Sequence, residues 1–499
     1  ANSSGTKNVA LGYEALNDNT TADDNVAIGD LALTKNTTGH SNTSVGNSSL
    51  DANTTGIRNT AVGFVALTLN TTGAQNTAIG KGALSANTTA DSNTAVGYHA
   101  LDLNTTGTLN VAVGVNALDA NTTADNNVAI GVESLGANTT GAANVAIGSN
   151  ALENNTTAAD NVAVGAACLS SNSTGTRNTA VGRNALNSSS TVNDNTAVGH
   201  DALTANTSGF KNTAIGSGAG EGNTTGDNLV AVGFNAAENN TTADDNTAVG
   251  SQALFTNTTG AKNTAIGTGA LYANTTAANN TAVGTSSLTA NTTGANNTAV
   301  GFSSGVSLTT GANTVALGAY AAQLLTTGSN NTAVGNATLG ATGSTAVTGS
   351  DNTAVGNSAL LAITTGANNT AVGSKALDAN TTAENNTAVG YHSLTANTTG
   401  TANTAIGMES LKANTTASNN TAVGLSALEL NTTGADNTAV GKGALDSNTT
   451  ASGNTAVGKS SMGANTTGQR NVAMGFQALD ASTTGSDNVA VGYEAGGGI

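Results

Sequence analysis

The chain has 499 residues, contains no proline or tryptophan, and carries only 9% charged side chains with a formal net charge of −17. This acidic balance argues against a nucleic-acid partner, because phosphate binding requires clustered lysine and arginine. No stretch approaches the roughly 20 consecutive apolar residues with which a helix crosses a bilayer, so no membrane span is predicted.

One short phrase recurs along the whole chain. It reads Asn-Thr-Ala-Val-Gly, two variable residues, Ala-Leu, two more, Asn-Thr-Thr-Gly and two more. Successive copies begin 17 residues apart, as at Asn8, Asn25 and Asn42. Disordered segments have no reason to keep apolar positions in register in this way. Such a period predicts an all-β parallel β-solenoid, in which each repeat forms one coil and about 29 coils stack along an axis.

The period is interrupted once, by a 21-residue step between Asn331 and Asn352. Near it the leucine at the ninth place of the coil is replaced, as at Gly305 and Ala322. A bulged coil that the stack tolerates is the preferred interpretation. The sequence therefore predicts a regular array over 1–339 with irregular coils from 301, an insertion or bulged coil over 340–351, and a second regular array over 352–499 that continues the first.

The second to fourth places of each coil are expected to form a short strand. The fourth is Val, Ile, Leu or Met in every coil, and the third is Ala in all but one, Ser44; β-branched residues favour strands. The fifth place is always glycine, which indicates a corner that needs a positive φ or a close backbone neighbour. The predicted corner glycines include Gly12, Gly29, Gly63, Gly80 and Gly97.

Ala-Leu at the eighth and ninth places forms a second apolar stretch, and Asn-Thr-Thr-Gly carries turn chemistry. Each coil is thus expected to bury about four apolar side chains, two of them alanines. Burial in so small a core offsets only part of the conformational entropy that the chain loses on folding. Burial between chains is the obvious remaining source of stability, which favours a homo-oligomer.

The twelfth place is nearly always asparagine, yet Leu308, Leu325 and Ile363 replace it around the irregular zone. Leucine resembles asparagine in size and not in polarity, which indicates a buried position. Buried amides one coil apart can form a hydrogen-bonded ladder; the alternative is that asparagine only suits the turn. The predicted ladder includes Asn36, Asn53, Asn70, Asn87, Asn104 and Asn121.

The last place of the coil carries charges of alternating sign. Its six pairs of charged residues one coil apart are all of opposite sign, as expected if parallel coils place these side chains beside each other. The pairs are Lys7/Asp24, Asp160/Arg177, Arg177/Asp194, Asp194/Lys211, Asp245/Lys262 and Arg470/Asp487.

The phrase Asn-Val-Ala-Ile-Gly at 25–29, 127–131 and 144–148 resembles the head repeat of trimeric autotransporter adhesins. The longer phrase that begins at Asn93 looks more like the repeats of phage tail-fibre and tail-fibre-like proteins. The resemblance implies a left-handed parallel β-roll and a homotrimer. The period of 17 is longer than in the adhesin heads, so the shape of the coil is expected to differ.

No constellation of catalytic or metal-binding residues is visible. Four dispersed histidines, His40, His99, His200 and His392, share no repeated carboxylate or cysteine partner. No cofactor or metal is predicted, and the chain is not expected to be an enzyme. Asn-Thr-Thr is also a formal glycosylation sequon, which a buried ladder would leave unused.

Three functions remain open. The first is a structural fibre: the shaft or head of a phage tail fibre or of a bacterial surface adhesin. The second is a self-assembling extracellular filament. The third, less favoured, is an ice-binding solenoid, motivated by stacked threonines such as Thr37 and Thr54. The expected partners are further copies of the chain and a cell-surface receptor or glycan, and the expected location is extracellular, on a cell surface or on a virion.

Overall fold

The computed structural model describes residues 3–341, 343 and 345–497. In these residues every regular element is a three-residue β-strand, one per coil, and there is no helix. The chain divides into two units, Ala1–Asn246 and Thr247–Ile499. The predicted insertion over 340–351 lies inside the second unit, and its residues Thr342 and Ser344 lie outside the described ones.

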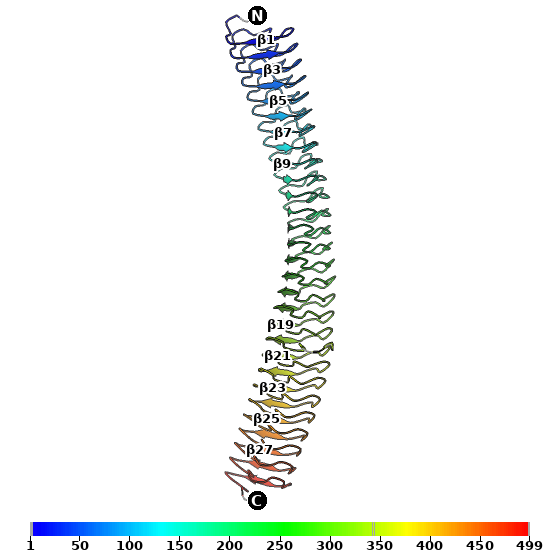
Figure 1. Ribbon diagram of the computed structural model, residues 1–499, viewed down its shortest axis with the longest axis vertical. Coiled ribbons are helices and arrows are strands. Elements are labelled where there is room, and N and C mark those ends of the chain that lie inside the picture. The colour runs from blue at the N-terminus through cyan, green and yellow to red at the C-terminus, as the bar shows by residue number, and fades with distance from the viewer. Residues whose placement is uncertain (1–2, 342, 344, 498–499) are drawn as a thin grey trace. The chain divides into compact units, whose positions relative to one another are not determined.

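The first unit contains fourteen strands, stacked in chain order (Figure 1). They are β1 Val9–Leu11, β2 Val26–Ile28, β3 Thr43–Val45, β4 Thr60–Val62, β5 Thr77–Ile79, β6 Thr94–Val96, β7 Val111–Val113, β8 Val128–Ile130, β9 Val145–Ile147, β10 Val162–Val164, β11 Thr179–Val181, β12 Thr196–Val198, β13 Thr213–Ile215 and β14 Val230–Val232.

The second unit contains fifteen strands in the same arrangement. They are β15 Thr247–Val249, β16 Thr264–Ile266, β17 Thr281–Val283, β18 Thr298–Val300, β19 Val315–Leu317, β20 Thr332–Val334, β21 Thr353–Val355, β22 Thr370–Val372, β23 Thr387–Val389, β24 Thr404–Ile406, β25 Thr421–Val423, β26 Thr438–Val440, β27 Thr455–Val457, β28 Val472–Met474 and β29 Val489–Val491.

Within each unit every strand pairs in parallel with the next one, and residues at the same place of successive coils face each other. In β4 and β5, for example, Thr60 faces Thr77, Ala61 faces Ala78 and Val62 faces Ile79. The prediction of an all-β parallel solenoid with about 29 coils of about 17 residues is confirmed.

The corner glycines meet both conditions that the sequence suggested. Gly63 has a φ of 138°, and a Cβ there would lie 2.5 Å from the carbonyl oxygen of Gly80 in the next coil. All five glycines named above have φ between 135° and 144° and face the next corner in the same way. No larger residue fits, because the corner is both left-handed and in contact with backbone.

The Ala-Leu stretch is a run of turns rather than a second strand. The residues at the seventh and ninth places adopt left-handed φ angles, as in Val65 at 51° and Leu67 at 52°. A leucine pays a steric penalty of about 1–2 kcal/mol in this conformation. The buried leucine side chain, which is inaccessible to solvent at Leu67, offsets that penalty by about 1.5–3 kcal/mol.

The extra residues of the long step are accommodated without loss of register. β20 and β21 pair across it with Thr332 facing Thr353 and Val334 facing Val355. The chain rejoins the regular path at Val347, whose carbonyl accepts a 2.8 Å hydrogen bond from the backbone of Thr326, as the thirteenth residue of an ordinary coil does. The four additional residues therefore lie between Gly340 and Val347.

We expect Gly63→Ala to destabilise the array locally by about 2 kcal/mol or more, because the new Cβ meets a backbone oxygen at a left-handed corner. Amide hydrogen exchange in the coils around 59–97 reports the loss. The matched control is Gly136→Ala, read out in its own coil, since Gly136 has no left-handed φ and a Cβ there would have no neighbour nearer than 3.4 Å. Equal protection in both variants would contradict the corner's role.

Candidate functional site: the strand face and the ladders beneath it

The six asparagines predicted at the twelfth place form a continuous buried ladder. In Asn36, Asn53, Asn70, Asn87, Asn104 and Asn121, Nδ2 donates to Oδ1 of the asparagine one coil earlier at 2.8–3.2 Å. The same Nδ2 also donates to the carbonyl three residues ahead, as from Asn70 to Gly73 at 2.9 Å. All six side chains are inaccessible to solvent, so the sequon asparagines cannot accept a glycan while these coils are folded.

A second amide ladder, which sequence analysis missed, runs through the first place of the coil. Oδ1 of Asn25 accepts a hydrogen bond from the backbone N–H of Asn42 at 2.9 Å, and Nδ2 of Asn42 donates to the carbonyl of Gly56 at 2.9 Å. The signal was present in the sequence, because asparagine fills this place in every coil except those of Leu229 and Thr314.

Where leucine replaces the twelfth-place asparagine at Leu308, the asparagine of the preceding coil is left with an unpartnered oxygen. Asn291 Oδ1 faces the coil of Leu308 and is buried without a hydrogen-bond partner, as is Thr314 Oγ1. Leu308, Leu325 and Ile363 are themselves buried. The twelfth place is thus an interior position, and apolar replacement there costs a ladder bond.

Missing leucines are compensated elsewhere in the core. At Gly220 a Cβ would lie 3.0 Å from Cδ2 of Leu203 and 3.2 Å from Cδ2 of Leu229. Leu229 occupies a place that is normally asparagine, and it reaches the space that a leucine at position 220 would fill. Leucine also moves from the ninth to the twelfth place in the coils of Gly305 and Ala322, which contain Leu308 and Leu325. The narrow interior thus keeps its total side-chain volume, while the place of the leucine within the coil changes.

We therefore expect Gly220→Leu and Leu229→Asn to rescue each other. The first change alone overpacks the core and the second alone opens a cavity, each at a cost of about 1–3 kcal/mol. Together they restore the ordinary coil, so the double-mutant cycle should give a favourable coupling of about 1 kcal/mol or more. Hydrogen exchange in the coils that contain residues 203–240 measures each variant, and additive losses would contradict the exchange of volume.

The charges at the last place of the coil pair only in part. Arg177 binds Asp194 through two hydrogen bonds of 2.7 and 3.1 Å, and Arg470 binds Asp487 at 2.7 and 2.9 Å. Lys7 Nζ lies 3.7 Å from Asp24. These three pairs stand one coil apart, as the alternating signs predicted.

The other three predicted pairs differ. Among the described residues, Asp160–Arg177 and Asp194–Lys211 form no ion pair, because Arg177 and Asp194 satisfy each other. Asp160 and Lys211 add only weaker electrostatic attraction to that pair. Asp245 belongs to the first unit and Lys262 to the second, so their pairing stays a prediction.

The hydrogen bonds from Arg177 lower the pKa of Asp194 below its ordinary value. The favourable contribution of such a carboxylate is present above its unfolded-state pKa and is lost as the pH falls through the folded-state pKa. We expect Arg177→Gln to return the pKa of Asp194 toward normal while the lowered pKa of Asp487, held by Arg470, stays unchanged. Carboxyl NMR titration measures both, and an unchanged Asp194 would contradict the pairing.

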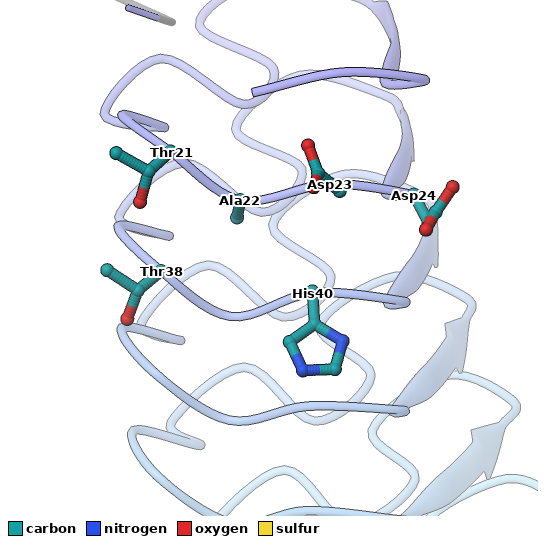
Figure 2. Close-up of a pocket in the computed structure, with 6 residues that line it drawn as sticks. All are labelled: Thr21, Ala22, Asp23, Asp24, Thr38 and His40. Carbon is teal, nitrogen blue, oxygen red and sulfur yellow. The ribbon is translucent and has the colours of Figure 1, made fainter. Parts of the chain in front are cut away.

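The hollows of the surface are shallow and do not gather a reactive set. One of about 310 Å³ is lined by Thr21, Ala22, Asp23, Asp24, Thr38 and His40. Figure 2 shows that Asp23 and His40 point in opposite directions along the stack, while the threonines point away from both. Asp23 is held by the backbone N–H and hydroxyl of Thr6 at 2.6 and 2.9 Å, which lower its pKa.

The remaining reactive side chains are scattered. His99 and His200 each contact a single carboxylate, Asp102 at 2.6 Å and Asp201 at 2.8 Å. The described part of the chain holds no group of three or more residues that could bind a metal ion, and no helix long and apolar enough to cross a membrane. Burial raises the pKa of the Cys168 thiol to about 12, so it stays protonated near neutral pH.

The structure corrects the expectation that each coil buries about four apolar side chains. Between the terminal coils only the central residue of each strand points inward, alanine except at Ser44, as in Ala78, whereas the fourth-place residue Ile79 is 40% exposed. The interior takes two alanines and one leucine per regular coil, and the bulkier β-branched residues face outward. Strand direction explains the difference, because successive side chains alternate between the two faces.

The outward face of the strands is uniform. Every strand carries Val or Thr at its first residue and Val, Ile, Leu or Met at its third, with no charged residue at either place. We call this two-column surface the strand face. Exposed members at the third residue include Ile28, Ile79, Ile130, Ile147, Ile215, Ile266, Val300, Ile406, Val440 and Met474.

Comparison with known proteins adds no identification. No family model matches the chain, and no curated protein matches it either. Function must therefore be argued from the coil itself.

Proposed function

We propose that this chain is a non-catalytic structural fibre, the shaft or head of a phage tail fibre or of a bacterial surface adhesin. The observation that carries the proposal is that the buried amides are largely committed to bonds between coils. Asn70, for instance, donates to Asn53 and accepts from Asn87. Bonds that repeat from coil to coil suit a structural fibre. Among the described residues, reactive side chains do not gather at one place.

The resemblance to tail-fibre and adhesin repeats supports the same function, with a homotrimer as the expected assembly and an extracellular, cell-surface or virion location. A receptor or glycan would bind at the variable places of the coil. Exposed aromatic residues occur at the sixth place, such as Phe64 and Tyr98. Phe476 and Tyr493 stack one coil apart with ring centroids 5.3 Å apart.

An ice-binding surface is the third candidate, behind the extracellular filament, and the strand face is the observation in its favour. The threonines that first suggested it do not form a flat pair, since Thr37 Oγ1 donates to the carbonyl of Thr54 while Thr38 is exposed. The strands do offer ranks of outward Thr and Val, as in Thr60 and Val62. Thermal hysteresis of the purified chain tests this candidate, and its absence would remove it.

We expect sedimentation analysis of the full chain to give a discrete particle of about three chain masses, each of 47.9 kDa. Electron microscopy of the same sample should show rods of one length. Open-ended polymers would favour the extracellular filament instead, and a folded monomer would contradict the homotrimer.

A further inference from the structure

A second glycosylation sequon, distinct from the Asn-Thr-Thr of the buried ladder, recurs in the second unit. In six of its coils the last place is asparagine, and asparagine and threonine follow at the first and second places of the next coil. The resulting Asn-Asn-Thr has the form Asn-X-Thr that asparagine glycosylation requires. It begins at Asn279, Asn296, Asn330, Asn368, Asn385 and Asn419.

Each residue of this sequon has its own structural reason. The last place of the coil has a left-handed φ, between 57° and 61° in the six asparagines, and asparagine tolerates this conformation better than most residues do. The middle asparagine belongs to the ladder at the first place of the coil. The threonine begins a strand, where β-branched residues are favoured. Three separate requirements of the coil therefore produce the sequon.

The two ends of the sequon face solvent while its middle faces the core. Asn279 is exposed and Thr281 is half-buried on the strand face, whereas Asn280 between them is inaccessible to solvent. The other five sequons of this kind show the same alternation. In the described part of the chain, none of the six threonine hydroxyls has a hydrogen-bond partner. The amide and the hydroxyl are thus presented together.

Surface hydrogen bonds orient some of these amides without covering them. Nδ2 of Asn330 donates to Oδ1 of Asp351 at 3.0 Å, and Nδ2 of Asn419 donates to Oδ1 of Asp436 at 3.1 Å. Both asparagines remain exposed. Because an amide nitrogen carries two hydrogens, each of them keeps a second N–H for reaction.

Sequons at other places of the coil illustrate what the last place adds. In the twelfth-place ladder the asparagine itself is buried. Asn47 is exposed, but the hydroxyl residue of its sequon, Ser49, is inaccessible to solvent. Asn154 is also exposed, and there the hydroxyl of Thr156 donates to a carbonyl of the next coil at 3.2 Å. An enzyme that acts on the folded chain must reach both groups that define the sequon.

We propose that the last-place asparagines of these six coils accept N-linked sugars on the folded chain, from a sugar nucleotide and an external glycosyltransferase. Nδ2 of the asparagine bonds to the anomeric carbon of the sugar, and the bond from that carbon to the phosphate oxygen breaks. The nucleoside diphosphate leaves with the electron pair, and a base takes one proton from the amide. Sugars on a surface are bulky and solubilising. This inference goes beyond the fibre function and does not depend on it.

The test incubates the folded full chain with UDP-glucose and a soluble asparagine glucosyltransferase, and peptide mass spectrometry locates each hexose. We expect hexose at Asn330 and Asn419, which have no last-place sequon in the adjacent coils. Adjacent sequons stand only about 4.8 Å apart, so we expect hexose on one or both members of the pairs Asn279/Asn296 and Asn368/Asn385.

The heat-denatured chain is the positive control, because unfolding releases the buried ladder asparagines. We expect those asparagines to gain hexose at least about tenfold more slowly in the folded chain, since they react only when their coils open.

A matched pair of substitutions should move the modification. Thr421→Val removes the sequon of Asn419. Val128→Thr completes a sequon at Asn126, an exposed last-place asparagine with a φ of 62° that lacks one. Valine and threonine both occur naturally as the first residue of a strand, so the coil is kept. We expect hexose at Asn419 to fall to the level of the untreated chain and hexose to appear at Asn126.

Three outcomes would overturn the inference. The first is a folded chain without hexose at the last place when its denatured form is modified. The second is equal modification of the ladder asparagines in the folded chain, and the third is hexose at Asn419 that persists after Thr421→Val. None of these readouts depends on how many chains associate, so the fibre function stands or fails separately.

Discussion

The structure depends on the direct superposition of each residue on its own copy in the next coil. At the corners this contact is close, with the carbonyl oxygen of Gly80 only 2.5 Å from where a Cβ of Gly63 would stand. Every other column inherits the same spacing. A residue type therefore suits a column only if it can contact an identical residue one coil away. Amides can, because they both donate and accept hydrogen bonds, and alanine and leucine can pack on themselves, whereas like charges repel.

This rule explains which columns the repeats keep. Asparagine can extend a ladder indefinitely, because its donor meets the acceptor of the previous copy. Arginine and aspartate must alternate, as Arg177 and Asp194 do. Leucine can exchange places with asparagine only where another leucine is missing, as at Leu229 beside Gly220, and the exchange leaves acceptors such as Asn291 Oδ1 without a donor.

Much of this arrangement follows from the sequence, and the parts that do not follow have a common cause. The period, the glycine corners and the burial of the twelfth place could be predicted, because Leu308 and Leu325 indicated an apolar environment for Asn. The direction of the strand could not. Large apolar residues are normally assigned to a core, whereas this coil is so narrow that it holds Ala78 and turns Ile79 outward. The first-place ladder was hidden because strand pairing alone accounts for a polar residue there.

The narrow interior and the apolar exterior are two aspects of one design. A coil that encloses only two alanines and a leucine gains little from its own core, and each strand turns its first and third side chains away from that core. Each coil instead repeats the same bonds to the coils before and after it, so the stability of a coil depends on its neighbours. Every added coil repeats these bonds, and the variable places of the coil can change without disturbing them.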